Sequence, residues 1–179
     1  MSSSPEVFRR FLRRVLVETG TFIGNGVQSA LDAGFEQVYS IEASPNLYER
    51  ALKRFTNDPR VTLVLGRSEV ELAHILEEVF EPATIWLDAH NCWEGLLEDT
   101  DKFPLHLEIA ALSKAPIRTH IVLVDDVRDF ATMHTSVEEV QDRLRQVNPD
   151  YQFSFLDGVR GAEGFLNDIL VAERVGSSC

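Results

Sequence analysis

The 179 residues suit one domain with a sizeable core, and shares of 44% hydrophobic and 26% charged residues exclude wholesale disorder. No run approaches the roughly 20 apolar residues that span a bilayer, no secretory signal pattern begins the chain, and two cysteines are too few for a disulfide framework, so we expect a cytoplasmic protein without a membrane segment. The formal net charge of −12 disfavours a nucleic-acid partner, because phosphate binding depends on basic residues that displace counterions.

The first predicted element is a short helix around segment 8–14, which reads FRRFLRR and holds the main cluster of basic residues. We interpret its arginines as the solvated face of that helix. The alternative is a docking patch for nucleic acid or an acidic partner, since a local patch can act against the net charge.

Short apolar segments then alternate with segments of helical period. The predicted strands are 14–19, 37–44, 61–66, 83–90 and 120–127, and the predicted helices are 25–34, 45–55, 68–80, 105–115 and 136–147. Two further strands, 151–158 and 167–174, are joined by a short glycine-containing loop. The pattern indicates a single α/β domain over 1–179: a doubly wound, mostly parallel seven-stranded sheet with helices on both faces and an antiparallel C-terminal edge hairpin.

Ligands of an open parallel sheet bind beyond the carboxyl ends of its strands. At these positions the sequence has glycine, polar or ionisable residues, namely Glu18 and Gly20, Glu42, Arg67 and Ser68, Asp88 and His90, and Asp125 and Asp126. Because acids are costly to enclose without a partner, a row of them at one edge of the sheet predicts a functional site.

The first candidate site is the turn ETGTFIGNG at 18–26. Gly20 permits a sharp turn and a close ligand, and Gly24 relieves crowding where the helix begins. Many such turns merely connect a strand to a helix, but Glu42 lies about 20 residues further on, where a carboxylate binds both hydroxyls of a ribose. The alternative for Glu42 is an acid at the start of the next helix, before Pro45.

A dinucleotide cofactor is a competing hypothesis for the same turn. GNGVQS at 24–29 is near the dinucleotide fingerprint. That fingerprint should begin where the strand stops, near Thr19, and the spacing from Gly20 to Gly24 leaves no tight pyrophosphate cradle. A nicotinamide cofactor is therefore disfavoured.

The chain order, the E-x-G-x-x-x-G turn and the acid after the second strand resemble class I S-adenosylmethionine-dependent methyltransferases over nearly the whole chain. In that family the sheet has seven strands, the last inserted antiparallel beside the sixth. The resemblance implies that the turn surrounds the methionine portion, that Glu42 holds the ribose, and that the residues after the third strand flank the adenine. The family often has an acid there, where this chain has Arg67. The implied cofactor-binding residues are Glu18, Gly20, Thr21, Gly24, Asn25, Glu42, Arg67, Ser68 and Asp88.

The second candidate site is the set Asp88, Asp125 and Asp126. Neighbouring strand ends lie about 5 Å apart, and carboxylates that close repel each other unless they are protonated or share a cation, for which a hard divalent ion is suited. The pattern is similar to catechol-type and macrolide-sugar O-methyltransferases, which implies that these three residues hold Mg²⁺ and that the metal lowers the pKa of an acceptor hydroxyl. The alternative is that Asp88 or Asp125 caps the following loop or helix.

His90, two residues past Asp88, is the candidate general base, because its ordinary pKa is near neutrality. The alternative is a hydrogen bond within its own loop. The long segment 91–104 that follows is a candidate lid or substrate contact. The string WLDAH, an L-x-x-E-I-x-A-L helix and a V-D-D strand end resemble a bacterial branch of uncharacterised class I methyltransferases.

The sequence thus predicts a methyltransferase that uses S-adenosylmethionine to methylate an oxygen of a small hydroxylated acceptor, with Mg²⁺ assistance and with Asp88 and His90 as catalytic residues. The alternatives are a metal-independent N- or O-methyltransferase and a non-catalytic scaffold that keeps the cofactor-binding fold. The short N-terminus favours the scaffold slightly, unless a homodimer partner closes the acceptor pocket.

Overall fold

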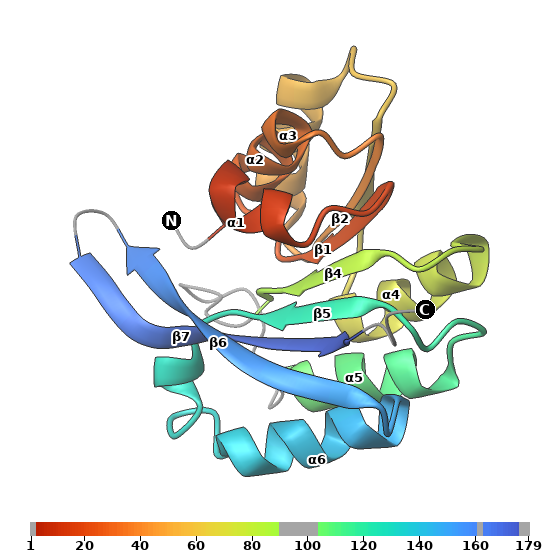
Figure 1. Cartoon of the computed structure of the whole chain (residues 1–179). Coiled ribbons are helices and arrows are strands. Elements are labelled where there is room, and N and C mark those ends of the chain that lie inside the picture. The colour runs from red at the N-terminus through yellow and green to blue at the C-terminus, as the bar shows by residue number, and fades with distance from the viewer. Residues whose placement is uncertain (1–2, 90–103, 161–162, 176–179) are drawn as a thin grey trace.

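The computed structural model describes residues 3–89, 104–160 and 163–175 (Figure 1). The strands are β1 (Val15–Thr19), β2 (Gln37–Glu42), β3 (Val61–Leu65), β4 (Thr84–Leu87), β5 (Ile121–Val124), β6 (Tyr151–Arg160) and β7 (Glu163–Arg174). The helices are α1 (Pro5–Arg10), α2 (Asn25–Ala33), α3 (Pro45–Phe55), α4 (Ser68–Glu78), α5 (Leu105–Lys114) and α6 (Val137–Val147), with one turn of 3-10 helix, η1 (Val127–Asp129), after β5.

The strands form one seven-stranded sheet in the order β3-β2-β1-β4-β5-β7-β6. The first five strands are parallel, and β7 runs antiparallel to both β5 and β6. This arrangement confirms the predicted sheet and its C-terminal hairpin. The strand order reverses between β1 and β4, and ligands of such sheets bind beyond the carboxyl ends of the strands at this switch point. We call this side of the sheet the carboxyl edge.

Helices cover both faces of the sheet (Figure 1), because the buried strands are apolar on both sides. Along β1, Val15 and Val17 face the core shared with α4, α5 and α6, whereas Leu16 faces the core shared with α1, α2 and α3. In the second core, Trp86 packs edge-on against Phe8 with ring centroids 5.3 Å apart, which fixes α1 on the sheet.

Several helix ends follow from local sequence. Ser44 caps α3 by accepting a hydrogen bond from the backbone N–H of Leu47, and Pro45 occupies the first turn. Gly34 ends α2 with a φ of 109°, a left-handed conformation that glycine adopts without strain. The predicted start of α3 and end of α2 are therefore confirmed.

The five parallel strands are shorter in the structure than predicted, most of all β4 and β5, and the two C-terminal strands are longer. β4 and β5 end at Leu87 and Val124, before the acids that follow them, and Asp126 has a φ of 57° that no strand accommodates. In contrast, β6 and β7 extend through the predicted loop, since Val159 pairs with Gly164 after an irregular register near Gly158. Gly158 and Gly164, which indicated a loop, thus lie in the paired strands of a long hairpin.

The arginines of segment 8–14 lie on α1 and on the turn that follows it. Arg9 donates to the carbonyl oxygen of Asp32 at 2.8 Å, and Arg14 pairs with Glu81. These contacts with neighbouring groups of the same chain agree with the interpretation of the arginines as the solvated face of a helix. Within residues 3–89, 104–160 and 163–175, no helix has the length and apolar character needed to cross a membrane.

Candidate functional site

The turn between β1 and α2 lies directly against the end of β4. Gly20 has a φ of 84°, and a Cβ at this position would overlap the carbonyl oxygen of Asp88. Gly24 has a φ of 79°, and a Cβ there would lie 2.5 Å from the ring of Phe55. Both glycines are therefore required by the backbone and its packing, as the sequence predicted for a tight turn.

Glu42 ends β2 with its carboxylate directed at this turn. Its Oε2 accepts a hydrogen bond from the backbone N–H of Phe22 at 2.7 Å, and its Oε1 accepts one from Ser44 at 2.8 Å. Phe22 itself has a φ of 50°, a left-handed conformation that costs energy outside glycine and that the surrounding contacts must hold in place. The turn and Glu42 thus hold each other in place, and the carboxylate keeps lone pairs for further donors.

Glu18 is buried beside the start of α2. Its Oε2 accepts a hydrogen bond of 2.6 Å from Ser40, whose hydroxyl also lies 2.6 Å from that of Thr21. Burial raises the pKa of Glu18 to about 8, and the charge of Glu42 adds to the rise while the Ser40 hydrogen bond opposes it. Gly26, for which the sequence predicted no role, also adjoins this carboxylate, since a Cβ there would overlap Oε1 of Glu18.

Asn25 and Arg67 are engaged with neighbouring side chains. Arg54 donates to Oδ1 of Asn25 at 2.9 Å, and Arg67 pairs with the carboxylate of Glu69. Ser68 begins α4 close to Glu42, because the backbone N–H of Gly66 donates to the carbonyl oxygen of Glu42 at 2.9 Å. The structure therefore places the predicted adenine segment next to the predicted ribose carboxylate.

Asp88 follows β4 and is held from two sides. Its backbone N–H donates to the hydroxyl of Thr19 at 3.1 Å, and the indole N–H of Trp86 donates to its Oδ2 at 3.3 Å. Burial raises the pKa of Asp88 well above its ordinary value, and the charges of Asp125, Asp126 and Glu18 raise it further. His90 and the candidate lid up to residue 103 lie outside the described residues.

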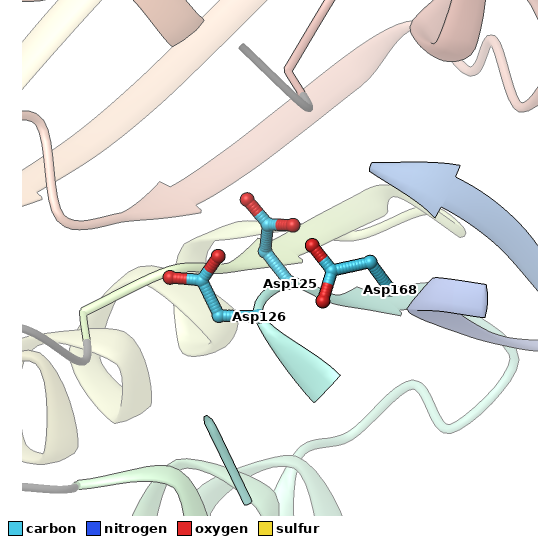
Figure 2. A group of neighbouring side chains, drawn as sticks. All are labelled: Asp125, Asp126 and Asp168. Atoms are coloured by element: carbon cyan, nitrogen blue, oxygen red, sulfur yellow. The ribbon is translucent and has the colours of Figure 1, made fainter. Parts of the chain in front are cut away.

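Three carboxylates converge after β5 and on β7, as Figure 2 shows. One oxygen from each of Asp125, Asp126 and Asp168 lies within 4.8 Å of the others, and we call these residues the acidic cluster. Asp168 joins the predicted pair Asp125 and Asp126 in this cluster, and the prediction that Asp88 is the third ligand stays a prediction. The place of Asp168 follows from register, since Val124 pairs with Leu170 in antiparallel β5 and β7, which brings residue 168 alongside residue 126.

Arg128, in η1, supplies a cation to the acidic cluster. Its guanidinium pairs with Asp126 and Asp168, its backbone N–H donates to Asp168 at 3.1 Å, and the group lies 4.5 Å from the ring centroid of Phe165. Each member of the acidic cluster offers only carboxylate oxygens, which are ligands that Mg²⁺ accepts. An ion would share Asp126 and Asp168 with this guanidinium.

Glu108 is a further acid that the sequence analysis assigned no role. It projects from α5 and is fully buried, and burial raises its pKa to about 7. The hydroxyls of Ser68 and Thr19 oppose that rise. The L-x-x-E pattern contains this residue, but its apolar surroundings in the helix give no sign that it faces the carboxyl edge.

The sheet order, the glycine turn and the acid after β2 define the Rossmann-like fold of class I methyltransferases. The sequence matches no protein-family model and no curated protein. The structure, however, matches solved structures along almost its whole length, at sequence identities that establish the fold alone.

Three solved structures illustrate this likeness. An O-methyltransferase from Bacillus cereus in complex with SAH is 19% identical, with a TM-score of 0.64 over 95% of this chain and 78% of that chain. A candidate rRNA-methylase from Clostridium thermocellum is 15% identical, with a TM-score of 0.67 over 96% of this chain and 95% of that chain. Spermidine synthase from Thermotoga maritima is 14% identical, with a TM-score of 0.62 over 96% of this chain and 57% of that chain.

Proposed function

We propose that this protein is an S-adenosylmethionine-dependent methyltransferase that methylates an oxygen of a small hydroxylated acceptor. The observation that carries the proposal is the carboxylate of Glu42, fixed by hydrogen bonds of 2.7 and 2.8 Å so that it faces the Gly20 turn. A carboxylate in that place is suited to accept both hydroxyls of a ribose.

The charge of the carboxyl edge suits the rest of the cofactor. Glu18 and Asp88 lie on either side of the turn, and both carboxyls have raised pKa values because they are buried near other acids. A sulfonium and an ammonium group would relieve this repulsion, since nearby positive charge favours the ionised carboxylate. The same residues would repel the pyrophosphate of a dinucleotide.

The acceptor is proposed to be small and uncharged. Within the described residues, the acidic cluster and Asp88 gather four carboxyls, of which Arg128 pairs with two, so a polyanion such as RNA would be repelled here. In the reaction, an acceptor oxygen attacks the methyl carbon, the carbon–sulfur bond breaks, and S-adenosylhomocysteine leaves. The acceptor proton passes to a base, for which His90 remains our candidate with Asp88 beside it.

The acidic cluster fits a hard divalent ion by the chemistry of its ligands, and Asp125 and Asp126 would hold it with either Asp88 or Asp168. Bound Mg²⁺ would polarise the acceptor hydroxyl and lower its pKa. Arg128 already balances two carboxylates, so part of this charge is supplied by the chain itself. Comparing turnover with Mg²⁺ and with chelator separates metal-assisted transfer from metal-independent transfer.

The first test is binding of S-adenosylmethionine and S-adenosylhomocysteine, measured by calorimetry. Glu42→Gln should weaken binding by about tenfold to a hundredfold, because it removes a charged acceptor of hydrogen bonds from the ribose. Glu49→Gln is the matched control, since Glu49 is an exposed acid on α3. Absence of heat and of a thermal shift for the wild-type protein at millimolar ligand would refute the proposal.

The by-product then identifies the group that is transferred. Methyl transfer releases S-adenosylhomocysteine, whereas aminopropyl transfer from decarboxylated S-adenosylmethionine releases 5′-methylthioadenosine. Incubation with hydroxylated acceptors and with diamines, followed by mass spectrometry, distinguishes the two. Tight cofactor binding without either by-product over a broad acceptor panel would favour the non-catalytic scaffold.

A further inference from the structure

The turn between β1 and α2 has a backbone shape that its neighbours must hold. Gly20, Phe22 and Gly24 have φ values of 84°, 50° and 79°, so three of the five residues 20–24 are left-handed. Such a shape persists only where the surrounding contacts impose it. The first half of the turn is held from β2, because the N–H of Gly20 donates to the carbonyl oxygen of Ile41 at 3.0 Å and the N–H of Phe22 donates to Glu42 at 2.7 Å.

The second half of the turn is held from the end of α3 by the exposed side chain of Arg54. Its Nη1 donates to the carbonyl oxygen of Ile23 at 2.8 Å and to Oδ1 of Asn25 at 2.9 Å. The guanidinium carbon lies 5.1 Å from the ring centroid of Phe55, and that ring packs against Gly24 so closely that a Cβ there would lie 2.5 Å from it. One side chain thus binds the residues on both sides of Gly24.

The stability of the fold gives little reason for a cation at this place. The N-terminus of a helix carries partial positive charge and disfavours a second one, and the first turn of α2 has no acid to offset it. Interactions of an exposed side chain contribute little to the free energy of unfolding, and α3 is already fixed on the core by its buried residues Ala51 and Phe55. The contacts of Arg54 therefore matter more for the shape of the turn than for the stability of the fold.

We propose, on the basis of the methyltransferase function proposed above, that Arg54 is a positioning residue, which holds residues 23–25 in the shape that receives the amino-acid portion of S-adenosylmethionine. A ribose at Glu42 lies beside Phe22, in the first half of the turn, and the amino-acid portion extends along the second half. Arg54 acts through the turn and does not touch the ligand. Without it, the ligand has to order the second half on binding, and that cost lowers its affinity.

The test compares S-adenosylhomocysteine with 5′-methylthioadenosine by calorimetry, because the second compound keeps the adenosine and the sulfur but lacks the amino-acid portion. Arg54→Met should weaken binding of S-adenosylhomocysteine by about fivefold to tenfold and binding of 5′-methylthioadenosine by about twofold or less. Arg50→Met is the matched control, since Arg50 is exposed one turn earlier on α3 and its loss removes the same charge. It should stay within about twofold of the wild-type affinity for both compounds.

Arg54→Lys tests whether the two hydrogen bonds cause the effect. One ammonium nitrogen has three donors, so it can replace both hydrogen bonds that Nη1 of Arg54 donates. This variant should bind S-adenosylhomocysteine within about threefold of the wild-type protein. Without ligand, the melting temperatures of Arg54→Met and Arg50→Met should agree within about 4 °C, because both side chains are exposed.

The outcomes separate this inference from the function on which it rests. If the wild-type protein binds neither compound, the methyltransferase proposal fails. If Arg54→Met binds S-adenosylhomocysteine no more weakly than Arg50→Met, or loses affinity for both compounds equally, only the positioning role is overturned. A loss in Arg54→Lys as large as that in Arg54→Met also overturns it, because the two hydrogen bonds would then not be the cause.

Discussion

Gly20 shows how one residue joins the fold to the site. Its positive φ and its contact with the backbone of Asp88 leave no room for a side chain. We expect Gly20→Ala to lower the free energy of unfolding by about 2 kcal/mol and to abolish cofactor binding, since both strain and overlap fall on backbone atoms that cannot rotate away.

Gly164 provides the matched control, because a Cβ there would have no atom within 4 Å. Gly164→Ala should keep the stability and the cofactor affinity of the wild-type protein. Chemical denaturation and calorimetry on the two variants measure both quantities. Wild-type binding by Gly20→Ala would mean that the turn is not the cofactor cradle.

Glu18 links binding to pH. With its pKa raised to about 8, Glu18 holds a proton near neutral pH, and a cationic ligand favours its ionised form. Binding of S-adenosylmethionine should therefore release a proton and tighten as the pH rises towards about 8. Calorimetry in buffers of different ionisation enthalpy measures the release.

Glu18→Gln is the variant that tests this assignment, because it cannot release a proton. It should bind the cofactor more weakly and without the pH dependence between neutrality and a pH of about 8. Glu49→Gln again serves as an exposed control. A proton release that persists in Glu18→Gln would assign the titration to another carboxyl.

At the scale of elements, Arg128 connects η1 to β7 through Asp168. Arg128→Met leaves a fully buried carboxylate without its guanidinium partner, and we expect a loss of about 3 kcal/mol in the free energy of unfolding. Millimolar Mg²⁺ should restore part of this stability, since Asp126 and Asp168 then lack the guanidinium with which they pair. Thermal unfolding with Mg²⁺ and with chelator measures the effect.

Arg143→Met is the comparison for this experiment, because Arg143 pairs with Glu139 on an exposed face of α6. That variant should lose less than about 1 kcal/mol and gain nothing from Mg²⁺. If Mg²⁺ stabilises the wild-type protein as strongly as Arg128→Met, the guanidinium and the ion do not compete for the same carboxylates.

The elements also show which parts of the site the sequence could predict. The acids at the carboxyl edge were predictable because each lies at the end of an apolar strand of a parallel sheet or directly after it, namely Glu18, Glu42, Asp88, Asp125 and Asp126. Asp168 was not, because its place beside Asp126 depends on the register of an antiparallel pair that the apolar pattern does not determine. The same limit applied to the hairpin, where glycines indicated a loop although the strands continue.

Glu108 illustrates a different limit. A single acid within an apolar helix pattern is compatible with either an exposed or a buried position, and only the packing of α5 on the sheet decides between them. Arg128 and Gly26 were missed for a related reason, since their roles arise from the side chains opposite them. The helices, the strands and the acids at strand ends were predictable, because they follow from the periodic pattern of apolar residues. Roles that depend on a tertiary contact were not.

At the scale of the whole molecule, the buried histidine and the buried glutamates make contributions to the free energy of unfolding that change with pH in opposite directions. His120 accepts a hydrogen bond from the backbone N–H of Ala83, and burial lowers its pKa to about 4. A histidine with a depressed pKa contributes stability above its ordinary value of 6.5, and this contribution is lost as the pH falls towards 4. Glu18 and Glu108 have raised pKa values, so their contribution is complete below 4.5 and is lost as the pH rises towards about 8 and about 7.

Above a pH of 6.5 most of the His120 contribution is already present, whereas the contributions of Glu18 and Glu108 are still being lost. The melting temperature of the ligand-free protein should therefore fall between a pH of 6.5 and about 8, and Glu108→Gln should reduce that fall. Saturating S-adenosylmethionine should reduce it as well, because the ligand stabilises the ionised form of Glu18 and binds only the folded state. His120→Gln should leave this region unchanged and remove the loss on the acidic side. A melting temperature that rises with pH in this window would show that the buried carboxyls are already ionised in the ligand-free protein, and the binding-linked proton release would then have no source.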